Sequence, residues 1–97
     1  MDEYFELNGI PFVWDQTKAR KNVKKHGVSF YQAAEAFFDP FFLVIDASPK
    51  EEVRDAIIGM DKRWNLLFVV HTCVEEEQIS IISVRKATRI ERKLYED

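Results

Sequence analysis

The spacing of hydrophobic and polar positions changes along the chain and predicts where strands and helices lie. Residues 4–7 and 10–14 are rich in aromatic and aliphatic side chains and flank Asn8-Gly9. Asn-Gly supplies the positive φ angles of a type I′ turn, so this stretch predicts a β-hairpin. Pro11 has no N–H to donate to a ladder, which predicts that the hairpin lies at a sheet edge.

Two helices are expected after the hairpin. Asp15 suits the N-cap of a helix that runs through His26 and ends at Gly27. Ser29 and Gln32 have the spacing of a capping box and predict the start of a second helix. Its apolar positions and its end are Phe30, Ala33, Ala34 and Phe37, then Asp39-Pro40. An aromatic stripe at helical spacing indicates a core-facing helix.

Four strand-like runs follow, and their connections are short enough for consecutive antiparallel pairing. They are residues 41–45, 53–60, 66–72 and 78–85. In the third run, residues 66–70 are apolar at every position, so this strand is expected to be central and covered at least in part on both faces.

A last helix is expected from Thr88, because Thr88 and Glu91 have capping-box spacing. The spacing of Ile90, Leu94 and Tyr95 suits one face of this helix. Together these elements predict an α+β fold in a single domain, residues 1–97. We expect helices on one face of a mostly antiparallel sheet and the C-terminal helix closing over one end.

Composition fits a globular chain with a real core, because 46% of its 97 residues are hydrophobic and 13% are aromatic. No stretch approaches the ~20 consecutive apolar residues of a membrane span. Met1-Asp2-Glu3 lacks the positive region of a signal peptide, so a cytoplasmic location without membrane contact is expected. Cys73 is the lone cysteine, and no metal site or other cofactor is expected.

The net charge of −3 hides two basic clusters, which hold ten of the fourteen Lys and Arg residues. One cluster lies between residues 18 and 25 and the other between residues 85 and 93. In the second, Arg85, Lys86 and Arg89 stand where a strand leads into a helix N-terminus, a place that favours an anion. The simpler alternative is that these residues only solubilise the chain and that Glu91 only caps.

Clustered Lys and Arg with two His and Tyr95 suit phosphate chemistry without a metal, because cations offset charge that develops on phosphodiester oxygens. In RNA cleavage the ribose 2′-hydroxyl loses a proton and the leaving 5′-oxygen gains one. Tyr, Lys, His or Glu could serve in either step, and spacing does not choose among them. His26 has two possible roles, to satisfy helix-end carbonyls or to contact phosphate.

Many positions resemble those of one bacterial toxin family. They are Trp14-Asp15, Lys18, Asn22, Lys25-His26-Gly27-Val28-Ser29-Phe30, Ala33, Phe38-Asp39-Pro40, Ile58-Gly59, Val70-His71-Thr72, Ile81-Ile82-Ser83-Val84-Arg85-Lys86-Ala87-Thr88-Arg89, Glu91 and Tyr95. This combination is similar to the BrnT family, toxins of type II toxin–antitoxin systems, over nearly the whole chain from Phe12 onward. The Lys-His-Gly-Val-Ser-Phe run and the Ile-Ser-x-Arg-Lys-Ala-Thr run are the most specific parts.

The resemblance implies a RelE-like fold and an endoribonuclease that arrests translation. It also implies a BrnA-type ribbon-helix-helix antitoxin as partner, in a heterotetramer of two toxins and two antitoxins that reaches operator DNA through the antitoxin. The catalytic candidates carried over by the resemblance are Arg54, Arg85, Arg89 and Tyr95. The candidates for RNA contact are Lys18, Lys21, Lys25 and His26, of which Lys25 and His26 are also candidates for acid–base work.

The chain departs from the family pattern at several positions. Cys73 and Val74, followed by three glutamates, stand where an Arg is usual. Ser80 replaces another commonly basic position, and Val84 replaces a small Ala. Fewer cations weaken phosphate binding. The alternative function is therefore a catalytically weak or inactive homologue that binds antitoxin as a transcriptional corepressor. For catalysis, the side chains of Arg54, Arg85 and Arg89 are expected within ~15 Å of one another.

Overall fold

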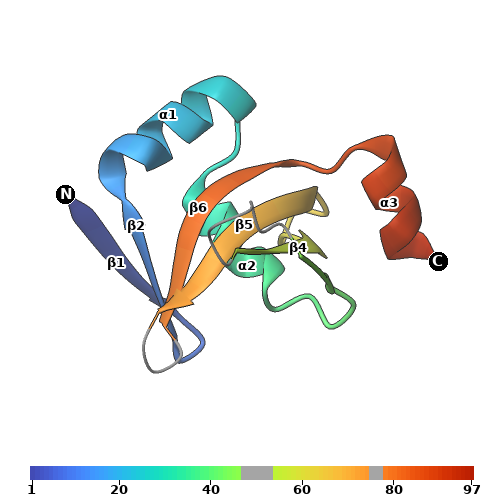
Figure 1. The fold of residues 1–97 in the computed structure, drawn as a ribbon, viewed down its shortest axis with the longest axis horizontal. Coiled ribbons are helices and arrows are strands. Elements are labelled where there is room, and N and C mark those ends of the chain that lie inside the picture. Colours follow the sequence, from blue (N-terminus) through green and yellow to red (C-terminus); the bar gives the residue numbers. More distant parts are fainter. Residues whose placement is uncertain (47–53, 75–77) are drawn as a thin grey trace.

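The protein is described by a computed structural model that covers residues 1–46, 54–74 and 78–97. Figure 1 shows its strands and helices. In chain order they are β1 (Asp2–Leu7), β2 (Ile10–Asp15), α1 (Gln16–His26), α2 (Phe30–Ala36), β3 (Leu43–Asp46), β4 (Asp55–Met60), β5 (Leu66–Val74), β6 (Gln78–Lys86) and α3 (Arg89–Glu96). This order confirms the predicted α+β fold, with two helices before the main strands and one after them.

The strands form one six-stranded sheet in the order β1-β2-β6-β5-β4-β3. All neighbours are antiparallel except β2 and β6, which run parallel and pair through Phe12↔Ile79 and Val13↔Ser80. Consecutive antiparallel pairing of the last four strands is therefore confirmed. β5 is an inner strand whose Leu67 and Val69 are buried, as its apolar sequence predicts.

The N-terminal hairpin forms as predicted, with positive φ angles of 49° at Asn8 and 83° at Gly9. Its position in the sheet is only partly as expected. β1 is the edge strand, whereas β2 also pairs with β6. Pro11 tolerates this place because it pairs with Glu6 of β1 and precedes Phe12, where the parallel ladder begins. The missing N–H of Pro11 therefore costs no bond of the β2–β6 ladder.

Both predicted helix starts are confirmed. The Asp15 carboxylate accepts the Lys18 N–H at 2.9 Å, and Ser29 and Gln32 form a complete capping box. The predicted end of the second helix is wrong, because α2 ends at Ala36. The N–H of Phe37 bonds to the Ala34 and Glu35 carbonyls, which tightens the last turn.

Strand boundaries differ by a few residues from those expected. β3 begins at Leu43, so Phe41 and Phe42 precede the strand. The expected strand start at Val53 lies outside the described residues. β5 and β6 are longer than predicted and reach Val74 and Lys86.

One face of the sheet carries the core, which α1 and α2 cover. The buried core residues include Phe12, Trp14, Phe30, Ala33, Ala34, Ile57, Leu67, Val69, Ile81 and Val84. On β4, a Cβ added at Gly59 would lie 2.6 Å from the Ala36 carbonyl oxygen, so only glycine lets α2 approach the sheet here. The predicted helix-covered face is therefore confirmed.

Asn22 joins α1 to β6 and determines where α1 lies. Its amide nitrogen donates to the carbonyls of Val84 at 2.8 Å and Val28 at 3.0 Å, and its oxygen accepts the Val84 N–H at 3.1 Å. The β2–β6 ladder includes only Ile79 and Ser80 of β6, so Asn22 supplies the bonds that a strand would make with Val84. The end of α1 is thereby held beside the last part of β6.

α3 forms from Arg89 with the predicted Thr88–Glu91 capping box, but its inward face differs from the expected one. Ile90 and Leu94 are 74% and 50% exposed, and α3 has no buried residue. Glu91 and Tyr95 instead bond to the rest of the molecule. The two aliphatic side chains are thus left on the surface. No helix in the described part of the chain is long and apolar enough to cross a membrane.

Candidate nucleic-acid interface

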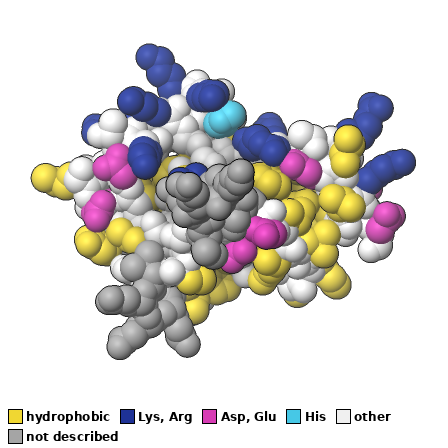
Figure 2. All heavy atoms as spheres, in the orientation of Figure 1, with side chains coloured by type: hydrophobic (Ala, Val, Ile, Leu, Met, Phe, Trp, Pro, Cys, Tyr) yellow, Lys and Arg dark blue, Asp and Glu magenta, His cyan; other side chains and the backbone are white. Residues whose placement is uncertain are grey.

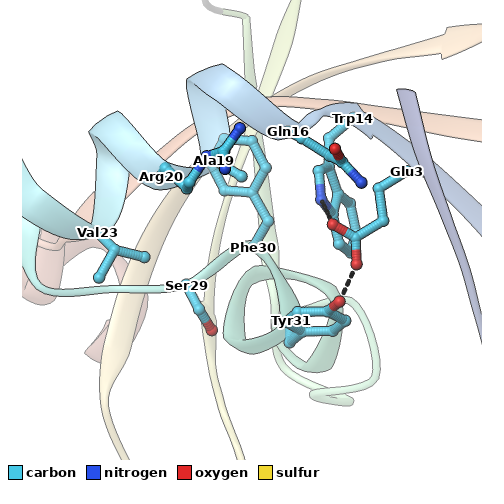
Figure 3. Close-up of a pocket in the computed structure, with 9 residues that line it drawn as sticks. All are labelled: Glu3, Trp14, Gln16, Ala19, Arg20, Val23, Ser29, Phe30 and Tyr31. Carbon is cyan, nitrogen blue, oxygen red and sulfur yellow. Dashed lines mark hydrogen bonds between the residues drawn. The ribbon is translucent and has the colours of Figure 1, made fainter. Parts of the chain in front are cut away.

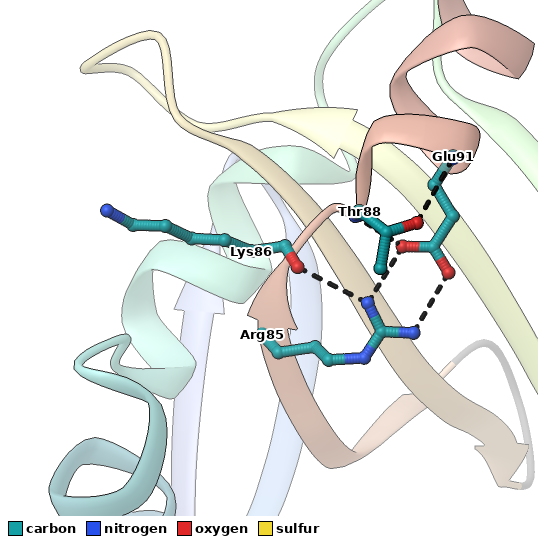
Figure 4. A network of polar contacts seen from close by, with 4 residues as sticks. All are labelled: Arg85, Lys86, Thr88 and Glu91. Atoms are coloured by element: carbon teal, nitrogen blue, oxygen red, sulfur yellow. Dashed lines mark hydrogen bonds and ion pairs between the residues drawn. The ribbon is translucent and has the colours of Figure 1, made fainter.

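Arg85, near the end of β6, is held from two directions. Its guanidinium carbon lies 4.3 Å from the ring centroid of Phe68, its register partner on β5. Its two terminal nitrogens donate to the Glu91 carboxylate, from Nη1 to Oε1 at 2.7 Å and from Nη2 to Oε2 at 2.9 Å (Figure 4). Such a fork over an aromatic ring restrains both the position and the plane of the guanidinium.

The other side of the Arg85 guanidinium is available to an anion. Nη1 also donates to the Lys86 carbonyl at 3.2 Å. Among the described residues, Nε and the second hydrogen of Nη2 have no acceptor. These donors point in parallel and match two oxygens of a phosphate. With 36% of the side chain exposed, Arg85 can bind an anion while it keeps its bonds to Glu91.

Glu91 has two structural roles at the start of α3. Its Oε1 accepts the Thr88 N–H at 2.8 Å, and the Thr88 hydroxyl accepts the Glu91 N–H at 3.2 Å. The hydrogen bond from Arg85, with that from Thr88, lowers the pKa of Glu91 despite partial burial. The same bond raises the pKa of Arg85 above its ordinary value. Because Glu91 also accepts two hydrogen bonds from Arg85, the interpretation that Glu91 only caps is wrong.

The exposed cations of the two clusters gather along one border of the molecule. Figure 2 shows Lys and Arg side chains along the upper border of the view, over α1, the end of β6 and α3. The exposed basic residues of these elements are Lys18, Arg20, Lys21, Lys24, Lys25, Lys86, Arg89, Arg92 and Lys93. We call this set the basic border. It gives a protein of net charge −3 one cationic surface.

The predicted RNA contacts on α1 separate into two groups. Lys25 and His26 lie one turn beyond Asn22, which bonds to Val84, the residue before Arg85. The C-terminal end of α1 therefore lies beside β6 on the face of Val84, whereas the Arg85 side chain stacks on Phe68 at the opposite face of the sheet, because successive side chains alternate along a strand. Lys18 lies at the other end of α1, where it lines a surface cavity of about 310 Å³ together with Ser80. Lys21, between the two ends, is exposed. His26 is half-buried.

Arg54 directly precedes β4 and lies in a different part of the sheet. Ile58 on β4 pairs with Phe68 on β5, and Phe68 pairs with Arg85 on β6. Arg54 lies four residues before Ile58. At ordinary strand spacings this offset is roughly 13 Å along the strands and roughly 10 Å across them. Only extended side chains would bring the two guanidinium groups to one phosphate. The catalytic role of Arg54 stays a prediction.

Tyr95 anchors the far end of α3. Its hydroxyl donates to Asp39 Oδ2 at 2.5 Å, and Asp39 also accepts the N–H groups of Met60 and Phe41, each at 2.9 Å. Burial and the bond to Asp39 raise the pKa of Tyr95 to about 12. Burial acts against ionisation of Asp39, but these hydrogen bonds lower its pKa overall. The phenol is protonated at neutral pH, so it can donate a proton but not accept one.

The second histidine belongs to the core. His71 is buried on β5, where its ring packs edge-on against Phe37 with the centroids 4.8 Å apart. Burial lowers the pKa of His71, so its imidazole is neutral at physiological pH. Within the described residues, no group of three or more His, Cys, Asp or Glu side chains could hold a metal ion.

A separate cavity of about 480 Å³ opens beside α1 and is lined by Phe30, Val23 and other side chains shown in Figure 3. Its carboxylate, Glu3, accepts hydrogen bonds from the Trp14 indole at 3.2 Å and from the Tyr31 hydroxyl. Glu3 thus ties the edge strand β1 to α2, and the bond raises the pKa of Tyr31. With its carboxylate engaged in this way, the cavity is a weaker candidate for phosphate chemistry than the Arg85 site.

Three parts of the Arg85 site have no clear signal in the sequence. Phe68 reads as one more apolar residue of a central strand, and nothing local connects Asp39 with Tyr95, 56 residues later. Glu91 is identified by its capping spacing, but its bond to Arg85 depends on the path of the chain between β6 and α3. The spacing of six residues across a strand–helix junction is the only hint of that pair.

Comparison with known structures identifies the class of fold. The crystal structure of the Brucella abortus ribonuclease toxin BrnT, at 1.1 Å resolution, matches this one with a TM-score of 0.61 and 27% sequence identity. The match covers 78% of this chain and 94% of that chain. The fold and its cationic strand–helix junction thus define a small α+β domain of the kind seen in a ribonuclease toxin.

The family follows from the sequence. The profile described as "Ribonuclease toxin, BrnT, of type II toxin-antitoxin system" matches residues 14–91. The chain therefore belongs to the BrnT family of toxins of type II toxin–antitoxin systems, as its sequence motifs predict. No curated protein sequence matches it.

Proposed function

We propose that this chain is an endoribonuclease that cleaves RNA without a metal ion and thereby stops translation. The observation that carries the proposal is the Arg85 guanidinium, which is oriented by Glu91 and Phe68. Its Nε hydrogen and one Nη2 hydrogen have no acceptor among the described residues. Arg85 lies near the end of β6, next to the basic border, and bonds to Glu91 in the first turn of α3, where the helix dipole also favours an anion. The family and the related toxin structure support the same activity.

In the proposed reaction, Arg85 binds two oxygens of the scissile phosphodiester, and Arg89 offsets the charge that grows on them. The ribose 2′-oxygen attacks phosphorus, the bond to the 5′-oxygen breaks, and a cyclic phosphate forms. A base takes the 2′-hydroxyl proton, and an acid gives a proton to the 5′-oxygen. Tyr95 is protonated at neutral pH and is proposed as the acid, while His26 and Lys25 are the candidates for the base.

Lys18 and Lys21 are proposed to bind RNA phosphates further along the basic border. Each such contact releases counterions, so RNA affinity should fall steeply with salt. We further propose a cytoplasmic location and neutralisation by a ribbon-helix-helix antitoxin of the BrnA type. Two toxins and two antitoxins would form a complex that binds operator DNA through the antitoxin. Membership of a type II toxin family supports a protein antitoxin as partner.

A second candidate function is a catalytically weak homologue that serves as an antitoxin-binding corepressor. It is favoured by Ser80, which lines the same cavity as Lys18 where the family pattern suggests a further cation. Glu91 also neutralises part of the charge of Arg85. This protein would bind its partner without harming the cell.

Induction of the chain in bacteria tests the proposal, with growth and bulk RNA integrity as readouts. The arms are wild type, Arg85→Ala and, as a matched control, Arg63→Ala, each with and without the neighbouring reading frame. Arg63 is exposed in the turn between β4 and β5 and does not belong to the basic border. We expect arrest and RNA cleavage with wild type and Arg63→Ala alone, relieved by the partner. Normal growth and intact RNA in every arm, with soluble expression, would favour the corepressor.

A further inference from the structure

The side of α3 formed by Ile90 and Leu94 is apolar and open. These side chains lie one helical turn apart and are 74% and 50% exposed. Figure 2 shows hydrophobic side chains at the surface of this face over α3 and the adjoining part of the sheet. A helix usually turns its aliphatic residues toward the core, so this orientation is unusual.

The exposure of Ile90 and Leu94 is not the result of a loosely attached helix. Glu91 bonds to Arg85 and Tyr95 bonds to Asp39, so both turns of α3 are tied to the body by residues on one face. An isolated helix of eight residues would be unstable in water, and these bonds hold it in place. The apolar side is therefore presented in a fixed orientation.

A basic stripe runs beside the apolar one. Arg89 and Lys93 are also one turn apart and precede Ile90 and Leu94 by one position each, about 100° around the helix. A complementary surface would carry apolar side chains with carboxylates along one edge. Charge and shape thus specify an amphipathic, acidic segment as the partner of this side.

We propose that the Ile90–Leu94 side of α3 is the docking site for an amphipathic, acidic segment of the antitoxin. This proposal rests on the proposed function, because it requires a protein antitoxin. A partner bound there would lie against Arg89 and beside Arg85, and so would exclude RNA from the phosphate site. Neutralisation would then need no change in the fold of the toxin.

Other occupants fit this surface less well. Two copies of the chain that met through α3 would bring Arg89 and Lys93 of one copy against those of the other, and like charges oppose this contact. A lipid surface would gain only two aliphatic side chains, far fewer than interfacial helices bury.

The test measures binding of the purified protein encoded by the neighbouring reading frame to the whole toxin chain. The variants are the double substitution Ile90→Ser/Leu94→Ser, the charge reversal Lys93→Glu, and Val44→Ser as a matched control. Val44 is an aliphatic residue on the edge strand β3 and is 65% exposed. Because all four residues are exposed, the variants should keep the wild-type melting temperature, which is checked first.

We expect the double substitution to weaken binding at least about 30-fold, the loss typical of a pair of hot-spot residues. Lys93→Glu should weaken binding about tenfold, mainly through slower association, and Val44→Ser less than about threefold. The double variant should still cleave RNA and resist inhibition by the partner.

Unchanged affinity of the double variant, or an equal loss with Val44→Ser, would overturn the docking site. Two other results would also overturn it. In the first, the wild-type chain sediments as a dimer and the double variant as a monomer. In the second, the wild-type chain binds anionic vesicles and the double variant does not. If the wild-type chain does not bind the protein encoded by the neighbouring reading frame, both the proposed docking site and the proposed antitoxin partner are contradicted. RNA cleavage by the chain alone decides the nuclease separately.

Discussion

Arg85 and Glu91, six residues apart, join through two hydrogen bonds of 2.7 and 2.9 Å across the junction between β6 and α3. One carboxylate thereby caps the helix and orients the cation at its N-terminus. The link explains how α3 stays ordered although none of its residues is buried. It also connects the stability of α3 to the geometry of the candidate phosphate site.

Replacement of Glu91 by alanine should therefore affect both stability and RNA binding. The variant loses the helix cap and leaves Arg85 without its carboxylate, so we expect a loss of about 1–3 kcal/mol in the free energy of unfolding. Denaturation by urea measures it. The matched control is Glu96→Ala, a carboxylate on the same helix that is 60% exposed and 4.0 Å from its partner, with a change below about 0.5 kcal/mol.

The Glu91→Gln variant separates the two roles. A glutamine can still accept the Thr88 N–H, but it has no charge with which to orient Arg85 by a fork of two bonds. We expect the free energy of unfolding of Glu91→Gln to lie between those of Glu91→Ala and wild type. Its KM for RNA should stay above that of wild type, and its kcat should change less than its KM. A KM equal to that of wild type would contradict a positioning role for Glu91.

Tyr95→Phe tests the proposed acid. Loss of the hydroxyl should reduce RNA cleavage at least tenfold, as general acids contribute about 10²- to 10⁴-fold, with RNA affinity nearly unchanged. The bond to Asp39 is lost as well, at a cost of about 1 kcal/mol in stability. Tyr4→Phe, at an exposed site on β1, should change neither property. If Asp39→Asn reduces cleavage as much, Tyr95 acts as an anchor of α3 instead.

Asn22→Ala should be among the most destabilising substitutions in α1. It leaves the N–H and carbonyl of Val84 and the carbonyl of Val28 without their partners in a buried place. The expected loss is about 2–4 kcal/mol in the free energy of unfolding, since each unsatisfied buried group costs about 1–3 kcal/mol. Lys21→Ala, at the preceding exposed position, should cost less than about 0.5 kcal/mol. Equal losses would show that α1 does not depend on this bridge.

Asp61 should make the fold sensitive to acid. It is 5% exposed in the turn between β4 and β5, and its carboxylate accepts four hydrogen bonds, from Gln32, Arg63 and twice from Asn65. Burial alone would raise its pKa, but these bonds lower the pKa below its ordinary value. The folded pKa lies below the unfolded one, so the stabilisation is fully present above the unfolded value and is lost as pH falls through the folded value.

The matched variant is Asp61→Asn. It replaces one carboxylate oxygen with an amide nitrogen, which cannot accept the hydrogen bonds that Asp61 receives from Gln32, Arg63 and Asn65. At pH 7 it should be less stable than wild type by about 1–3 kcal/mol. The difference should shrink as pH falls below the ordinary pKa of an aspartate and through the lower pKa of Asp61 in the folded chain. Unfolding by urea at several pH values measures it. A difference that does not depend on pH would show that Asp61 acts only through its shape.

Much of the fold follows from short-range rules that act within a few residues. The hairpin at Asn8-Gly9, the caps at Asp15, Ser29 and Thr88, and the apolar central strand are all confirmed, because turn geometry, capping and periodicity are local. The basic junction at Arg85 could be predicted for the same reason. The predicted end of α2 is wrong, since apolar spacing does not distinguish an α-helical last turn from the tighter turn that the Phe37 N–H makes with the Ala34 carbonyl.

Long-range contacts determine the rest. Asn22 meets Val84 across 62 residues and Tyr95 meets Asp39 across 56, pairings that depend on how the sheet is assembled. Periodicity places Ile90, Leu94 and Tyr95 on one helix face, but it does not tell which part of that face packs. Glu91 is turned toward the body of the protein by the hydrogen bonds that it accepts from Arg85. Tyr95 is turned the same way by the hydrogen bond that it donates to Asp39. The aliphatic pair is left at the surface because α3 is attached by polar contacts rather than by burial.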